Sequence, residues 1–136
     1  MQSVQRRVAA RDAAPAQLVH DEKVRLDGDR LVALYGELGE AGAEAVICRA
    51  IEDLATALAD LQRLAVACDL APMPGRARLL ARIAEDIGMV SLSRVALDVA
   101  VCAGRGDLAA LAAVLARLVR IGDRSLTAVW DLQDRD

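Results

Sequence analysis

A long helical stripe in the middle of the chain limits the possible folds most strongly. Apolar side chains recur at alternating steps of four and three: Ile47, Ile51, Leu54, Leu58, Leu61, Ala65 and Cys68. This spacing puts them on one side of an α-helix, whereas the side chains of a β-strand alternate with a period of two. Because Ala50, Ala57 and Leu64 widen the stripe beyond a coiled-coil seam, we expect this helix to contact two neighbours in a bundle.

The composition agrees with a helical domain. Hydrophobic residues make up 55% of the 136 residues, yet the chain has no phenylalanine, one tyrosine and one tryptophan. Cores of β-sheet proteins use β-branched and aromatic side chains, whereas alanine and leucine at this density favour helices. A chain of this length fits one domain.

Charge and hydropathy argue against several classes of function. The formal net charge is -3, whereas nucleic-acid binding needs a basic excess, so no nucleic-acid partner is predicted. No apolar run approaches the roughly 18 residues of a membrane span. The N-terminal "MQSVQRRVAARDAAPAQ" has arginines without the hydrophobic run of a secretory signal. We therefore predict a cytoplasmic protein with no membrane partner.

Capping residues and prolines mark the ends of the first two predicted helices. A short helix is predicted from an N-cap at Asp27 or Asp29 to Gly39, where glycine is the usual terminator. The long striped helix follows. It should stop at Pro72 and Pro74, because proline cannot continue the hydrogen-bond ladder.

Three more helices are predicted in the second half of the chain. One runs from about Pro74 or Gly75 to Ile87 and is closed by Gly88, the next opens with Ser91 as its N-cap, and the last follows the reversal "AGRGD" with Asp107 as its N-cap. The side chains expected to face inward are Leu80, Ile83, Ala84, Ile87, Leu92, Val95, Val99, Cys102, Leu108, Leu111, Leu115, Leu118, Leu126 and Val129, with Gly122 in the same register.

These elements predict an all-α fold. Four long helices joined by short loops should be antiparallel neighbours, so we expect an up-down-up-down four-helix bundle with a short extra N-terminal helix. The bundle should comprise residues 27–136. Residues 1–26 lack a sustained pattern and are interpreted as a partly disordered tail.

Groups able to carry out chemistry are sparse. The single histidine, His20, lies in the predicted tail as "LVHDEK", and no second His or Cys stands at metal-ligand spacing near it. Ser91 and Ser93 have no histidine base in any recognisable motif, and "GRGD" lacks the strand that precedes a phosphate-binding loop. The sequence therefore predicts no catalytic residue, no metal and no cofactor, and the protein is not expected to be an enzyme.

The remaining polar groups have plain structural interpretations. The three cysteines are predicted to be buried free thiols: Cys48, Cys68 and Cys102. Glu52, Asp53 and Asp98 lack the Glu-x-x-His pairs of a di-metal bundle and are interpreted as solvated, while Tyr35 and Trp130 are interpreted as packing anchors. A second arginine stripe is interpreted as a solvated face partly paired with Asp123, an anion or partner site being the alternative: Arg117, Arg120 and Arg124.

The candidate working surface lies in "RLLARIAEDIG", residues 78–88. Arg78, Arg82 and Glu85 fall one above another on the side of the predicted helix away from its apolar residues. This row of side chains, called the arginine stripe below, is predicted to dock a protein partner.

The order of the elements resembles the histidine phosphotransfer (HPt) domain of bacterial two-component relays. "LVALYGELGEAGAEAVICRAIEDLATALADLQ" is similar to the first two helices of that family, and "IGMVSLSRVALDVAVCAGRGDLAAL" is similar to its later helices and "GD" turn. The resemblance covers about residues 29 to 126.

The chain departs from that family at the functional positions. The family's motif has a histidine, Lys and Gly three and four places later, and a second Gly ten places after the histidine. If Gly88 is the second glycine, Arg78 stands at the phosphoacceptor position, Ala81 at the lysine and Arg82 at the first glycine. No histidine occurs from residue 21 to 136. A guanidinium stays protonated and cannot replace the imidazole nucleophile.

The resemblance therefore implies a non-catalytic HPt-like interaction module. It would dock a receiver or histidine kinase of a bacterial two-component system without accepting phosphate. The alternative is a self-associating structural bundle, such as a homodimer, with no link to a phosphorelay.

Overall fold

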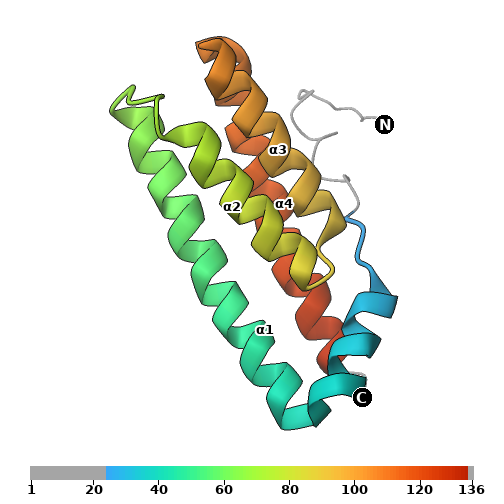
Figure 1. The fold of residues 1–136 in the computed structure, drawn as a ribbon. Helices are drawn as coiled ribbons and strands as arrows, with labels where there is room; N and C mark the ends of the chain where they lie inside the picture. Colours follow the sequence, from blue (N-terminus) through green and yellow to red (C-terminus); the bar gives the residue numbers. More distant parts are fainter. Residues whose placement is uncertain (1–23, 135–136) are drawn as a thin grey trace, which may run out of the picture.

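A computed structural model describes residues 24–134 and contains four helices and no strand within that range (Figure 1). They are α1 (Gly28–Val66), α2 (Met73–Asp86), α3 (Val90–Arg105) and α4 (Leu108–Asp134). The predicted all-α class is confirmed, and so is the prediction of four long helices. Among the described residues, none of the helices has the length and apolar character needed to span a membrane. The predictions for residues 1–23, which include His20, lie outside the described residues.

Helix α1 contains the short helix that the sequence predicts, joined to the long striped helix through a kink. Gly39 has non-helical backbone angles, φ 74° and ψ 174°, a combination that is essentially restricted to glycine. The helix begins after Asp27, whose side-chain Oδ1 accepts a hydrogen bond from the Arg30 amide at 3.1 Å. The boundaries predicted at Asp27 and Gly39 are therefore confirmed.

Residues 24–27 hydrogen-bond to the turn between α2 and α3, and this segment is called the clasp below. The Asp27 amide donates to the Gly88 carbonyl at 2.7 Å, and the Arg30 guanidinium donates to the Asp86 carbonyl at 2.8 Å. Gly88 has a φ of 78°, and a Cβ added there would lie 2.7 Å from the Asp27 carbonyl oxygen. Position 88 therefore requires glycine for two reasons, the positive φ angle and the close approach of the Asp27 carbonyl oxygen.

The prediction that Ser91 is the N-cap of α3 is wrong. The N-cap is Met89, and it makes no side-chain capping bond. Instead, the amides of Val90 and Ser91 donate to the Arg25 carbonyl at 3.1 and 3.3 Å, and Ser91 Oγ accepts from the Arg25 amide at 2.7 Å. A backbone carbonyl brought in by tertiary structure thus satisfies the free amides that a capping side chain would otherwise satisfy. The Asp107 cap of α4 is confirmed by the bond from the Ala110 amide to its Oδ1, at 3.1 Å.

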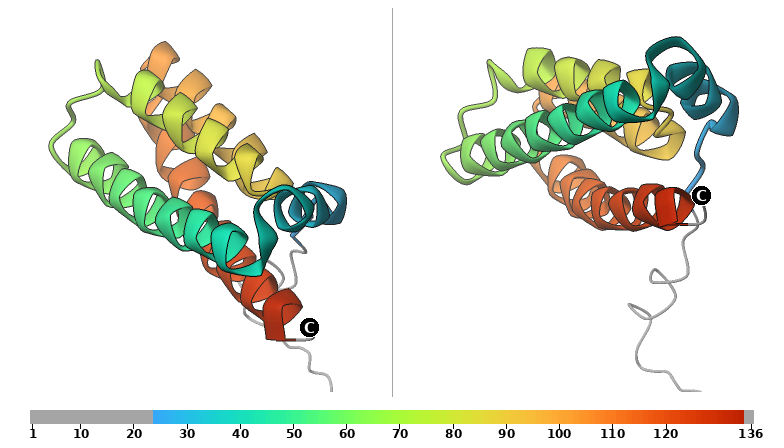
Figure 2. Two further views of the ribbon diagram at one scale, coloured as in Figure 1. Left: turned by 60° about the horizontal axis from the view of Figure 1, so that its bottom comes forward. Right: turned by 90° about the horizontal axis from the view of Figure 1, so that it is seen from below.

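The core lies along the α2–α3 pair, whose two helices make the most extensive contact in the molecule (Figure 2). Helix α1 packs on α2 and α4 packs on α3, whereas α1 and α4 contact each other over a short stretch only. The largest fully buried apolar side chains come from all four helices and the α2–α3 turn: Ile47, Leu61, Met73, Leu80, Ile87, Met89, Val95, Val99, Leu118, Ile121 and Val129.

Several predicted burials are wrong. Leu108 is 56% exposed, because it is the first residue of α4 and lies at the end of the bundle. Cys68 is exposed because α1 ends at Val66 and residue 68 lies in the following turn with a φ of 53°. Cys48 is also exposed, one residue beyond the buried Ile47 and so rotated about 100° away from the core, while Cys102 is half-buried.

Candidate protein-docking surface

The arginine stripe lies on the outer side of α2. Arg78, Arg82 and Glu85 are all exposed. The opposite side of the helix is buried through mostly small side chains: Met73, Ala77, Leu80, Ala81 and Ala84. The small residues allow α2 to lie close to its neighbouring helices. The long charged side chains lie on the other side of the helix and reach solvent.

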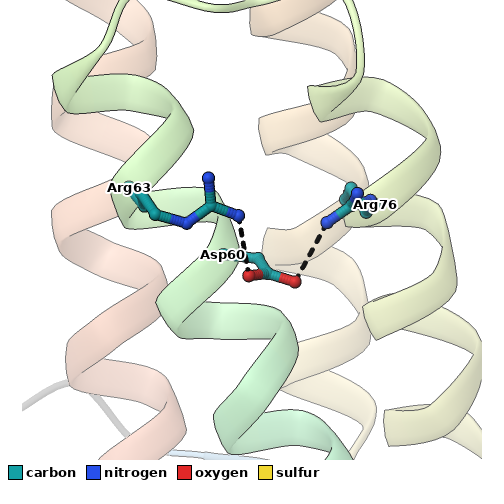
Figure 3. Close-up of polar contacts among 3 residues, drawn as sticks. All are labelled: Asp60, Arg63 and Arg76. Carbon is teal, nitrogen blue, oxygen red and sulfur yellow. Dashed lines mark hydrogen bonds and ion pairs between the residues drawn. The ribbon is translucent and has the colours of Figure 1, made fainter.

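The stripe side chains make no hydrogen bond or ion pair with other described residues. Their neighbour Arg76 differs, because its guanidinium bonds to Asp60 Oδ2 of α1 at 2.9 Å. Asp60 Oδ1 in turn accepts from Arg63 at 3.0 Å, so one carboxylate holds an arginine from each helix (Figure 3). Arg76 is therefore used within the fold, while Arg78 and Arg82 keep their donors for solvent or a partner.

The electrostatics of the stripe favour an anionic partner. Arg78 and Arg82 stand four residues apart, where like charges on a helix repel weakly. A guanidinium group presents a planar array of donors that fits a carboxylate. Glu85 lies three residues beyond Arg82, so the surface is basic at one end and acidic at the other.

Two apolar side chains of α3 are also exposed. Leu97 is 46% exposed and Val101 is 49% exposed. Their spacing of four, outside the inward row of α3, is a signal in the sequence that would have predicted this exposure.

The positions taken from the HPt motif are not equivalent in this fold. Arg78 and Arg82 are exposed, but Ala81 is only 4% exposed. A lysine at position 81 would have to place its stem and its charge in the packed interior, which is costly for an unpaired ammonium group. Among the three positions, therefore, only 78 and 82 can present a functional side chain to a partner.

The other sequence candidates are placed without forming a second site. No group of three or more His, Cys, Asp or Glu side chains that could hold a metal occurs among residues 24–134. Asp53 Oδ1 accepts from Arg49 at 3.3 Å, and Glu52 and Asp98 are exposed. Arg120 and Arg124 are half-buried while Arg117 and Asp123 are exposed, so this stripe is less solvated than predicted. Tyr35 is half-buried against the core.

Comparisons of the chain with protein-family models, curated proteins and solved structures found no match. Function is therefore inferred from the residues of this chain.

Proposed function

We propose that this protein is a non-catalytic HPt-like module that docks a signalling protein through the arginine stripe of α2. The partner would be a receiver or histidine kinase of a bacterial two-component system in the cytoplasm. The observation that carries the proposal is the pair of exposed arginines, Arg78 and Arg82, without a partner among the described residues, on a helix that is otherwise tightly packed.

An antiparallel, up-down-up-down order belongs to the same proposal. It is supported by the short connections between the helices, residues 67–72, 87–89 and 106–107. Connections of this length join neighbouring helices that run in opposite directions. The kink at Gly39 then makes residues 28–38 the short extra helix of an HPt-like bundle.

Phosphotransfer itself is not part of the proposed function. The reaction requires an exposed imidazole nitrogen on the helix, and no histidine occurs from residue 21 to 136. The guanidinium at position 78 offers donors instead of a nucleophile. A surface of this kind binds the acidic pocket of a partner through charge-assisted hydrogen bonds, which contribute about 1.5–3 kcal/mol each.

The test is charge reversal with a matched control. Tagged wild-type protein, the Arg78→Glu/Arg82→Glu variant and an Arg94→Glu/Arg105→Glu control are used to capture proteins from a bacterial lysate. The control changes the net charge equally at two exposed arginines on α3. We expect mass spectrometry to identify receivers or kinases with the wild type and the control but not with the stripe variant. Circular dichroism should be unchanged in all three.

Equal capture by all three proteins would mean that the stripe is only a solvated face. Capture of the bait alone would favour the alternative of a self-associating structural bundle. The observation behind that alternative is an apolar groove between α1 and α4, whose lining includes Leu58 of α1 and Leu126 of α4. If the groove joins two copies, sedimentation velocity would show a concentration-dependent dimer.

A further inference from the structure

An apolar hollow lies between α1 and α2, which run side by side (Figure 1). Its volume is about 400 Å³, and most of its lining is apolar: Ala45, Val46, Ala50, Ile83 and Ile87. Val46 is 41% exposed, whereas Ile87 is 1% exposed. The hollow therefore has a buried apolar floor and an apolar wall that reaches solvent.

A row of apolar side chains on α2 leads into this hollow. Leu79, Ile83 and Ile87 stand four residues apart and therefore lie next to one another on the helix. Their exposure falls along the row: Leu79 is 44% exposed, Ile83 is half-buried and Ile87 is 1% exposed. Charged side chains follow the same steps one residue earlier: Arg78, Arg82 and Asp86. A charged row and an apolar row thus run side by side along α2.

Two neighbouring rows with this spacing fit the side chains of another helix. Side chains four residues apart form ridges on a helix, and the groove between two ridges takes a ridge of the same kind from a partner helix. Four residues advance a helix by about 6 Å. If an apolar side chain of the partner helix lies in the hollow, the side chains four and eight positions away therefore lie opposite Arg82 and Arg78.

The charges around the hollow determine which side chains the partner helix should carry. Arg78 and Arg82 make no ion pair with other described residues, so carboxylates opposite them would form charge-assisted hydrogen bonds. Asp53 and Asp86 line the hollow itself, where a carboxylate would be repelled. Arg49 also lines the hollow, but it is already bonded to Asp53 at 3.3 Å. The matching helix therefore has an apolar side chain at the hollow and carboxylates one and two turns away from it.

We propose that the partner of the arginine stripe docks through an amphipathic helix, which places an apolar side chain in the α1–α2 hollow and carboxylates on Arg82 and Arg78. The inference rests on the proposed function, because it uses the same two arginines. It adds the hollow as the feature that selects among acidic partners. An acidic surface without the apolar side chain would bind more weakly.

The test is titration of the 136-residue protein with helical peptides, followed by NMR of its backbone amides. Two alanine-based peptides carry one leucine, with glutamates four and eight positions after it in one peptide and before it in the other, and the tighter binder is the probe. We expect replacement of the probe's leucine by alanine to weaken binding at least about tenfold, equivalent to about 1.4 kcal/mol. The Val46→Asn variant should also bind the probe several-fold more weakly than the wild type. The matched control, Val66→Asn, should bind like the wild type, because Val66 is 88% exposed and lies about 30 Å further along α1.

Equal affinities of the leucine and alanine peptides, or of the Val46→Asn and Val66→Asn variants, would overturn the inference. The absence of binding by both leucine peptides at millimolar concentration would overturn it as well. The Arg78→Glu/Arg82→Glu variant separates this inference from the proposed function. If that variant loses both kinds of peptide while leucine adds no affinity for the wild type, only the role of the hollow is excluded. If that variant keeps its full affinity for the leucine peptide, the stripe does not dock acidic side chains, and the proposed function fails with it.

Discussion

Substitution of Gly88 tests whether the clasp of residues 24–27 holds the end of α2 in place. Gly88 and Gly106 both have positive φ, 78° and 67°, so alanine at either position costs about 1–2 kcal/mol in backbone energy. At Gly106 no atom lies within 4 Å of the added Cβ, whereas at Gly88 the Asp27 carbonyl oxygen lies at 2.7 Å. Gly88→Ala must therefore also displace the clasp.

The displacement has a cost that follows from the hydrogen bonds involved. Moving the clasp breaks the bonds from the Asp27 amide to Gly88 and from the Val90 amide to Arg25. Each bond contributes about 0.5–1.5 kcal/mol, so Gly88→Ala should lower the free energy of unfolding by about 2–5 kcal/mol in total. Gly106→Ala should lower it by the backbone cost alone.

Urea denaturation followed by circular dichroism measures both variants against the wild type. The expected result is a larger loss for Gly88→Ala at an unchanged m-value. Equal decreases in the free energy of unfolding for the two alanine variants would refute the reasoning, because the close approach to Asp27 would then not affect stability.

The remaining predictions concern phosphotransfer and the core. The wild-type protein should stay unlabelled when incubated with a phosphorylated receiver or an active kinase; acid-labile phosphate mapped to His20 would contradict the non-catalytic interpretation. Arg78→His alone should also stay unlabelled, because Arg82 lies one turn away on the same side. Adding Arg82→Gly, at a helix cost of about 1 kcal/mol, should permit detectable transfer from a compatible receiver; the same result from the single variant would mean that Arg82 does not block approach. Leu61→Ala should lower the free energy of unfolding by about 2–5 kcal/mol, and Leu58→Ala should lower it by clearly less. The reason is that Leu61 is 0% exposed, whereas Leu58 is half-buried beside the groove. A larger loss of stability for Leu58→Ala than for Leu61→Ala would show that the groove is closed in solution.

Local sequence signals predicted the parts of the fold that depend on local chemistry. Gly39 and Asp107 end or begin helices because of backbone angles and side-chain bonds that involve only their near neighbours. Gly88 was recognisable from its backbone angle alone, although the close approach of Asp27 also requires a glycine there. The same reasoning failed at Ser91, because its amide is satisfied by Arg25, 66 residues earlier in the chain. A capping residue is recognisable from sequence, but a remote carbonyl that makes the cap unnecessary is not.

In the candidate site, too, features set by local spacing were predictable from the sequence, whereas features set by contacts between helices were not. Helical spacing alone placed the arginine stripe on the exposed side of α2, as the structure has it. The partner of Arg76, by contrast, comes from another helix, so spacing could not separate this engaged arginine from the two unengaged ones. Leu58 appeared to be a core residue because its periodicity is the same as that of Leu61. Whether α4 covers it depends on how far α1 and α4 diverge, which the pattern within one helix does not determine.

The contacts at the two ends of α2 explain why a helix without a nucleophile can still present a defined surface. Its first turn is held to α1 by Arg76 and Asp60, and its last carbonyl accepts from Arg30 of α1. The Arg76–Asp60 pair is partly exposed, so it contributes at most about 1 kcal/mol and mainly fixes orientation. A helix fixed in this way loses little conformational freedom when a partner binds, which favours affinity. Arg78 and Arg82 lie between these two anchors, so their backbone is held in place while their side chains remain available. This is the arrangement that docking requires. Phosphotransfer would require a histidine there as well.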